Sequence, residues 1–242
     1  MKKLIVTEVA LRDGSHVVGH QFTKEQVRYI TEQLSHAGVP YIEVTHGDGL
    51  GGSSLQYGFS KEYDIELVKT AVEVAGNSTI SVLLLPGIGT IEDLKEAYDA
   101  GARMVRVATH VTEADVSRQH IETAKRMGME TIGFLMMSHS APPEVLLEQA
   151  KLMESYGANA VYVTDSAGAM LPSDVTARIT LLKAHLSIDI GFHAHNNLSL
   201  AVANSLAAIE AGANRIDGSI CCLGAGAGNT QTEVLVGVLN RL

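Results

Sequence analysis

Short apolar runs rich in β-branched residues recur along the whole chain, separated by segments in which apolar positions follow helical spacing. The runs are continuously apolar, which is typical of strands buried on both faces of a parallel sheet. The pattern predicts eight strands, at residues 4–11, 41–45, 79–85, 104–109, 131–137, 160–164, 188–193 and 215–220.

The segments between these runs carry signals of helix boundaries. Thr23 stands three residues before Gln26, and Thr230 stands three before Glu233. This is the spacing of a capping box, in which each side chain accepts a hydrogen bond from the other residue's backbone N–H. Glycines such as Gly101 follow helical stretches and suit the left-handed conformation of a C-terminal cap. We therefore expect a helix after each strand.

Eight strand–helix units predict an α/β protein, a (β/α)₈ TIM barrel formed as a single domain by residues 1–242. A doubly wound open sheet is the alternative, because it has the same alternation of strands and helices. That fold would place a Gly-rich phosphate-binding turn after its first strand, but residues 12–16 read Arg-Asp-Gly-Ser-His. The sequence therefore favours the barrel.

The composition limits the possible binding partners more than it limits the possible folds. Hydrophobic residues make up 46% and charged residues 19% of the 242 positions, which is enough for a sizeable core. The formal net charge of -9 argues against nucleic-acid and anionic-membrane partners, and no apolar run approaches the ~18 residues of a membrane span. The only cysteines, Cys221 and Cys222, are adjacent, so we expect no disulfide framework and a reducing, cytoplasmic location.

Polar side chains gather where the predicted strands end, which is the catalytic face of a TIM barrel. His193 and His195 share a face of their strand because they are two residues apart. Asp13 follows the first strand. Around a closed barrel, only the eighth strand would lie between the first strand and the seventh. We expect these three to bind a divalent ion such as Mn²⁺, with Mg²⁺, Co²⁺ or Zn²⁺ as alternatives. Further histidines follow strand ends at His16, His20, His46, His110 and His139.

Five residues near these ligands have alternative roles. Arg12 either stabilises a developing enolate or forms a surface salt bridge. His16 and His20 are rival candidates for a general base, or else they order the loop after the first strand. Glu43 lies inside a predicted strand and needs a buried partner, for which a metal-ligating histidine or Arg12 would serve. Asn229 is either an additional ligand or a loop stabiliser.

The lysines favour metal chemistry over a Schiff base. None lies within a predicted strand or at its C-terminal end. A Schiff-base aldolase needs a desolvated lysine near that end of the barrel. Carbanion chemistry in this barrel would therefore depend on a metal ion acting as a Lewis acid.

Together these motifs resemble a known group of barrels. The stretches 11–14, Leu-Arg-Asp-Gly, and 193–196, His-Ala-His-Asn, with a final Ala-Gly-Asn at 227–229, are similar to metal-dependent lyases and Claisen synthases such as 3-hydroxy-3-methylglutaryl-CoA lyase and isopropylmalate synthase. The closer resemblance is to the 4-hydroxy-2-oxovalerate aldolase family. It spans nearly the whole chain, with matching stretches at residues 20–21, 42–54, 83–90, 106–110, 133–137 and 162–168.

This resemblance implies a class II aldolase that cleaves 4-hydroxy-2-oxopentanoate to pyruvate and acetaldehyde in the meta-cleavage degradation of aromatic compounds. It implies that Asp13, His193 and His195 bind Mn²⁺, and that Asp13 and His193 also contact the small 2-oxo acid substrate. It further implies that Arg12 binds and stabilises the pyruvate enolate. His16 would accept the C4 hydroxyl proton.

The resemblance also implies that Ser166 helps bind the substrate carboxylate and that Leu83 and Leu85 shape the aldehyde end of the pocket. Full-length family members continue beyond the barrel in a segment that packs on an acylating acetaldehyde dehydrogenase, and this sequence stops at Leu242, before that segment. Two alternatives stay open. One is a related 4-hydroxy-2-oxo acid aldolase, or a Claisen-type acyl-CoA synthase or lyase, with another substrate. The other is a metal-binding barrel subunit without catalytic activity.

Overall fold

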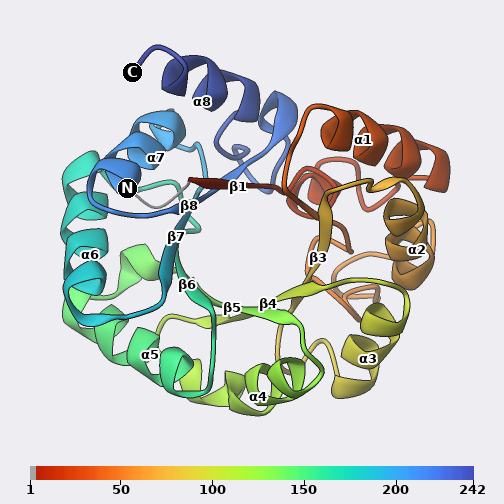
Figure 1. The fold of residues 1–242 in the computed structure, drawn as a ribbon, viewed down its shortest axis with the longest axis horizontal. Coiled ribbons are helices and arrows are strands. Elements are labelled where there is room, and N and C mark those ends of the chain that lie inside the picture. The colour runs from red at the N-terminus through yellow and green to blue at the C-terminus, as the bar shows by residue number, and fades with distance from the viewer. Residues whose placement is uncertain (1–3) are drawn as a thin grey trace.

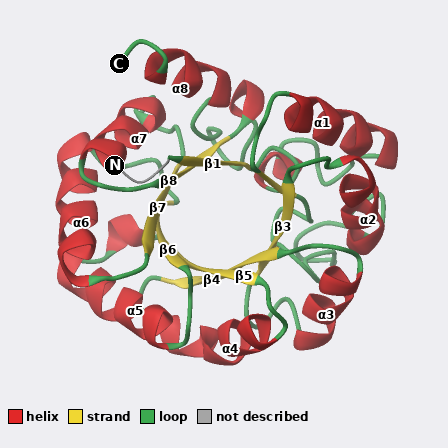
Figure 2. Ribbon diagram, viewed as in Figure 1, coloured by secondary structure: helices red, strands yellow, loops and turns green. Residues whose placement is uncertain are grey.

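The computed structural model describes residues 4–242 and contains a closed barrel of eight parallel strands in chain order, with the last strand paired to the first (Figure 1 and Figure 2). An open sheet has two unpaired edges, whereas every strand here has two neighbours, so the doubly wound alternative is wrong and the TIM barrel is confirmed. The strands are β1 (Ile5–Glu8), β2 (Tyr41–Glu43), β3 (Thr79–Leu84), β4 (Met104–His110), β5 (Glu130–Met136), β6 (Ala160–Asp165), β7 (Asp189–Ala194) and β8 (Arg215–Gly218).

A helix follows each strand, and the helices surround the barrel as a ring in Figure 1. They are α1 (Lys24–His36), α2 (Asp64–Val74), α3 (Ile91–Asp99), α4 (Arg118–Arg126), α5 (Pro143–Ser155), α6 (Pro172–His185), α7 (Ala201–Glu210) and α8 (Thr232–Leu239). Short 3-10 helices occupy loops that leave the C-terminal ends of strands, the face where TIM barrels carry their sites. These are η1 (Asp13–His16), η2 (Ala114–Ser117), η3 (Ser138–Ser140) and η4 (Ile220–Cys222).

The first strand is shorter than predicted, and its early end positions two residues of the site. β1 ends at Glu8 because the chain turns at Val9, whose carbonyl accepts the N–H groups of Arg12 at 3.0 Å and Asp13 at 2.8 Å. Arg12 and Asp13 therefore lie on a turn and not on a strand. Their side chains therefore do not have to point to opposite faces of the sheet, as consecutive residues of a strand do.

One of the two predicted capping boxes forms. Thr23 and Gln26 bond each other's backbone N–H groups at the start of α1. The prediction of a capping box formed by Thr230 and Glu233 is wrong, because α8 begins only at residue 232. The hydroxyl of Thr230 lies 2.9 Å from that of Ser205, and the Glu233 carboxylate accepts a backbone N–H from η4. Tertiary hydrogen bonds have replaced the local ones.

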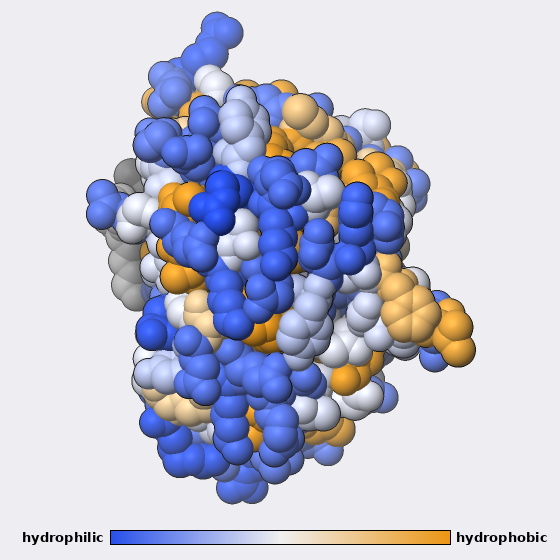
Figure 3. Space-filling view, turned by 90° about the vertical axis from the view of Figure 1, so that its right-hand side faces the viewer, coloured by the Kyte–Doolittle hydropathy of each residue, from blue (hydrophilic) through white to orange (hydrophobic). Residues whose placement is uncertain are grey.

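The main apolar core lies between the strands and the surrounding helices, whereas the inside of the barrel holds a charged side chain. Arg106, on β4, is fully buried there, with its guanidinium carbon 4.5 Å from the centre of the Phe134 ring. The outer surface shown in Figure 3, on the α1–α3 side, is mainly hydrophilic. Within residues 4–242, no helix has both the length and the apolar character to cross a bilayer.

Candidate active site

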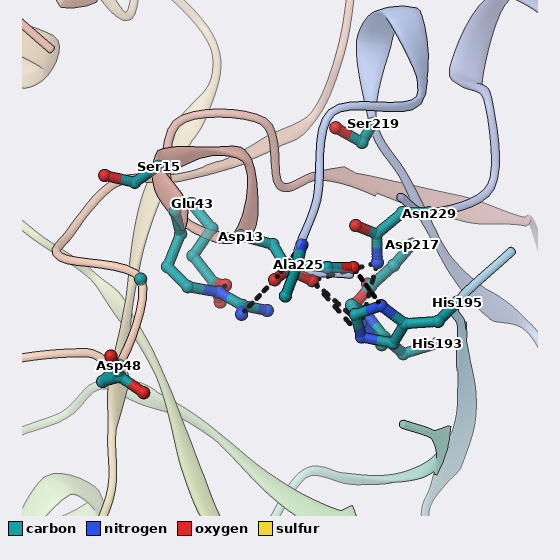
Figure 4. Close-up of polar contacts among 12 residues, drawn as sticks. Asp13, Ser15, Glu43, Asp48, His193, His195, Asp217, Ser219, Ala225 and Asn229 are labelled. Carbon is teal, nitrogen blue, oxygen red and sulfur yellow. Dashed lines mark hydrogen bonds and ion pairs between the residues drawn. The ribbon is translucent and has the colours of Figure 1, made fainter. Parts of the chain in front are cut away.

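Three side chains meet at the C-terminal end of the barrel, where β7, β8 and β1 adjoin. Asp13 begins η1, His193 lies in β7 and His195 directly follows that strand. Asp13 Oδ2 lies 3.2 Å from His193 Nε2 and 3.7 Å from His195 Nε2, and the two Nε2 atoms are 3.3 Å apart (Figure 4). The structure thus brings together the three residues expected to bind a metal ion.

The spacing of these atoms fits one divalent ion. Ligands about 2.1 Å from an ion lie roughly 3 to 3.5 Å from one another in tetrahedral or octahedral geometry. The other ring nitrogens are already engaged, because His193 Nδ1 lies 2.6 Å from Asp217 Oδ2 and His195 Nδ1 lies 3.1 Å from the Ala225 carbonyl oxygen. Both oxygens are acceptors, so each Nδ1 carries a proton and each Nε2 can present its lone pair to an ion.

Neighbouring charges set the protonation of these side chains. Burial alone would raise the pKa of Asp13, but Arg12 and His193 hold it well below its usual value. Burial acts to lower the pKa of His193, but hydrogen bonds to Asp13 and Asp217 raise it above its usual value. Burial and the charge of His193 lower the pKa of His195. A bound ion would replace the proton shared by His193 and Asp13, so metal binding is coupled to proton release.

Asn229 is a fourth candidate ligand. Its Nδ2 lies 2.9 Å from Asp13 Oδ2 and 3.0 Å from His193 Nε2. Its Oδ1 is buried and has no hydrogen-bond partner among residues 4–242. The oxygen and nitrogen of an amide are assigned from their hydrogen bonds alone, and a half-turn of this amide would place Oδ1 beside two ligand atoms. The unpartnered oxygen therefore fits the chemistry of a metal ligand.

Buried ion pairs support this group from inside the barrel. Arg12 Nε lies 2.5 Å from Glu43 Oε1, and Arg106 contacts both Glu43 and, at 2.5 Å, Asp217. Glu43 thus has the buried arginine partner that its position required. Arg12 is itself buried, so its interpretation as a surface salt bridge is wrong. Sequence reasoning missed Arg106 and Asp217, for which the available signal was a charge inside an otherwise apolar run.

A cavity of about 210 Å³ opens beside the three candidate ligands. No lysine lines it among the residues that the structure describes, which agrees with the absence of a Schiff-base lysine from the strand ends. Eight of the residues predicted for the site reach it: Arg12, Asp13, His16, Leu83, Leu85, Ser166, His193 and His195. Unpredicted residues complete its wall: Gly47, Asp48, Phe134, Met136, Thr164 and Ala225.

The structure distinguishes the two histidines that were rivals for a general base. His16 lines the cavity, whereas His20 is buried outside it, with Nδ1 3.4 Å from Ser15 Oγ. The ring of His20 stacks on His46 at a centroid distance of 3.6 Å. His16 is therefore the one placed to touch a substrate. Of the remaining strand-end histidines, neither His110 nor His139 reaches the cavity.

The fold and this site define a TIM-barrel protein with a centre of two histidines and one carboxylate. Residues 3–242 match the HMGL-like family model. The 4-hydroxy-2-oxovalerate aldolase of Geobacillus stearothermophilus is 68% identical over 237 residues, which cover 98% of this chain and 69% of that protein. The chain therefore belongs to the HMGL-like family and, within it, to the 4-hydroxy-2-oxovalerate aldolase family of carbon–carbon lyases.

Two further comparisons agree with this assignment. The 4-hydroxy-2-oxovalerate aldolase of Bacillus thuringiensis (strain Al Hakam) is 65% identical over 237 residues, covering 98% of this chain and 70% of that protein. An N-terminal domain solved from Bacteroides vulgatus superimposes with a TM-score of 0.84 at 26% identity, covering 98% of this chain and 80% of that one. The similarity in sequence and in fold thus extends over almost all of the chain.

Proposed function

We propose that residues 1–242 act as one catalytic domain that cleaves 4-hydroxy-2-oxopentanoate to pyruvate and acetaldehyde. The observation that carries this proposal is the convergence of Asp13, His193 and His195 at 3.2 to 3.7 Å beside a small cavity that also holds Arg12 and His16. Those five residues combine a candidate metal centre, a cation and a proton acceptor. A retro-aldol cleavage of a 2-oxo acid needs all three kinds of group.

The candidate ligands suit a divalent ion with mixed nitrogen and oxygen ligation, and we propose Mn²⁺, with Mg²⁺, Co²⁺ or Zn²⁺ as alternatives. Asp13, His193 and His195 would hold it, and the unpartnered Oδ1 of Asn229 would add a fourth donor. When bound, the ion supplies a Lewis acid for the 2-oxo group of the substrate.

The protein's own residues account for the proton and charge movements. His16 lines the cavity and accepts the proton of the C4 hydroxyl, after which the C3–C4 bond breaks. The electron pair of that bond passes to C3 and gives the enolate of pyruvate, while C4 leaves as the aldehyde. Arg12 Nη2 is buried without a partner among residues 4–242, which leaves an N–H for the enolate oxygen. The proton held by His16 then passes to C3, which completes pyruvate and restores the neutral imidazole.

Other cavity residues fit the two ends of the substrate. The Ser166 Oγ accepts the backbone N–H of Met137 at 2.9 Å, so its own hydroxyl proton is free for the substrate carboxylate. Leu83 and Leu85 form an apolar wall that suits the methyl group of the aldehyde. The acetaldehyde is what an acylating acetaldehyde dehydrogenase would consume. That partner, a role in aromatic catabolism and a cytoplasmic location are proposals that rest on the family.

Release of pyruvate from 4-hydroxy-2-oxopentanoate by the purified chain tests this function. We expect release with Mn²⁺, its loss after a chelator removes the ion, and its recovery when Mn²⁺ is restored. A matched assay without protein measures spontaneous cleavage. A folded chain that binds Mn²⁺ but releases no pyruvate above that background would overturn the proposed activity for this chain.

A further inference from the structure

A second group of side chains with metal-ligand chemistry lies near the candidate metal centre of Asp13, His193 and His195, which is called the first centre below. One nitrogen each of His16 and His20 and one carboxylate oxygen of Asp48 all lie within 4.8 Å of one another. The histidines belong to the loop after β1 and Asp48 belongs to the loop after β2, and these strands are paired neighbours. Two imidazoles and one carboxylate suit a transition-metal ion such as Zn²⁺ or Co²⁺.

The His20 ring is held in position by its neighbours. His20 has a φ of 61°, and its ring stacks on His46 with 19° between the planes. Its Nδ1 lies 3.4 Å from the backbone nitrogen of Gly47, which directly precedes Asp48. His16 meets the His20 ring edge-on at a centroid distance of 5.1 Å. These contacts fix the His20 ring beside His16 and beside the backbone that leads into Asp48.

Gly47 allows the two loops to approach this closely. A Cβ atom at Gly47 would lie 2.5 Å from His16 Nε2, so a side chain there would force the His16 ring to move away. The His16 ring therefore lies against the backbone that leads into Asp48. Figure 4 shows Asp48 well apart from Asp13 and His193, and the ligand atoms of His16, His20 and Asp48 form a group separate from those of Asp13, His193 and His195. His16 and Asp48 nevertheless line the same cavity as that centre.

We propose that His16, His20 and Asp48 form a second site, specific for a transition-metal ion, and that an ion bound there inhibits the enzyme. Ligands of such an ion lie roughly 3 to 3.5 Å apart, so the side chains must close by at most about 2 Å. His16 and Asp48 are only half-buried and can rotate to do so. The inhibition rests on the proposed function, because an ion on His16 removes the acceptor of the C4 hydroxyl proton. The binding does not rest on it.

Equilibrium dialysis of Zn²⁺ against the purified chain, followed by metal analysis, tests the binding. We expect two equivalents per wild-type chain and one in Asp13→Asn, which retains only the second site. In His20→Asn and Asp48→Asn the second equivalent should bind at least about tenfold more weakly, a loss that even an outer partner of a metal ligand produces. His110→Asn, a matched change on the same face outside the group, should keep both equivalents.

A wild-type chain that binds one equivalent, all of it lost in Asp13→Asn, would overturn the second site. A second equivalent of unchanged affinity in both His20→Asn and Asp48→Asn would also overturn it. Circular dichroism serves to check that each variant is folded. Asp48 is half-buried, so Asp48→Asn keeps the test available if His20→Asn does not fold. The Asp13→Asn arm reports on the first centre separately, so the two proposals fail independently.

Inhibition is then measured as pyruvate release at saturating Mn²⁺ with increasing Zn²⁺, each variant being scaled to its own rate without Zn²⁺. We expect the half-inhibiting Zn²⁺ concentration to rise at least about tenfold in Asp48→Asn, as the loss of one ligand predicts. His110→Asn should match the wild type. Equal half-inhibiting concentrations in all three chains would refute the inhibitory role.

Discussion

His193 Nδ1 lies 2.6 Å from Asp217 Oδ2, and this contact turns the opposite nitrogen of the ring toward Asp13. Asp217 is buried, and its charge is balanced by Arg106 at 2.5 Å. A carboxylate that accepts the far N–H of a ligating histidine fixes the tautomer and raises the basicity of the nitrogen that faces the ion. The barrel interior thus orients His193 toward the candidate metal centre.

Asp217→Asn should weaken metal binding. An amide at this position carries no charge to support the Nδ1 proton of His193, and the loss of such a partner typically costs about 10- to 100-fold in metal affinity. A titration of Mn²⁺ binding measures this change. Asp189→Asn is the control, because Asp189 pairs with Arg215 at the opposite end of the barrel and should leave the affinity unchanged. Equal affinity in both variants would contradict the role of Asp217.

Gly224→Ala should displace Asn229 and weaken the same site. A Cβ atom at Gly224 would lie 1.5 Å from Asn229 Oδ1, so the amide that lies between Asp13 and His193 has to move. We expect lower Mn²⁺ affinity with little change in the unfolding midpoint. Gly237→Ala in α8 is the matched control, because nothing lies within 4 Å of its added Cβ. Unchanged affinity in Gly224→Ala would show that Asn229 does not contribute to the site.

Arg106→Met should destabilise the fold. Arg106 is fully buried and pairs with Glu43 and Asp217, so its removal leaves two buried carboxylates with less compensation. Breaking a buried pair in this way typically costs about 3 to 5 kcal/mol. Urea unfolding of the metal-free chain measures the loss. Arg28→Met, which removes a solvent-exposed pair with Glu73, should leave the midpoint nearly unchanged, and a similar midpoint for both variants would contradict this account.

His46 makes the stability of the metal-free chain depend on pH. Burial lowers the pKa of His46 from 6.5 to about 4, and its Nδ1 accepts the backbone N–H of Asp48 at 3.0 Å. Between these pH values the unfolded chain binds more protons than the folded chain, so the free energy of unfolding rises with pH through this window. The contribution is full above pH 6.5 and is lost as the pH falls toward 4. It amounts to roughly 3 kcal/mol.

Urea unfolding at several pH values in the presence of a chelator measures this effect. Other groups titrate in the same window, so the informative quantity is the difference between His46→Gln and the wild type. We expect a shallower decline below pH 6.5 in His46→Gln. His36→Gln, at an exposed position in the last turn of α1, should retain the wild-type slope. Identical slopes for His46→Gln and the wild type would rule out this contribution.

The barrel and the convergence of the three candidate metal ligands were predictable because their signals are local. Strands buried on both faces are apolar throughout, and the spacing of His193 and His195 places both on one face whatever surrounds them. The family resemblance added Leu83 and Leu85, which no local pattern indicates, and a substrate-binding role for Ser166, and all three residues line the cavity.

The remaining features depend on contacts between distant parts of the chain. Arg106 and Asp217 are 111 residues apart in sequence, so nothing near either one indicates that they pair. The early end of β1 depends on a turn closed by the Val9 carbonyl, although residues 9–11 continue an apolar run. Thr230 has a capping spacing but bonds a side chain of another helix, Ser205. Tertiary contacts override local preference at these positions.

In the proposed mechanism, Asp13, His193 and His195 hold the ion on which carbon–carbon cleavage depends. The most direct measurement follows Mn²⁺ binding and pyruvate release from 4-hydroxy-2-oxopentanoate together, in the wild type and in Asp13→Asn, with circular dichroism to confirm folding. We predict that Asp13→Asn loses both, with Mn²⁺ affinity lower by at least about tenfold and pyruvate release falling in step. If Asp13→Asn no longer binds Mn²⁺ but releases pyruvate at the same rate as the wild type, the proposed role of the ion is contradicted.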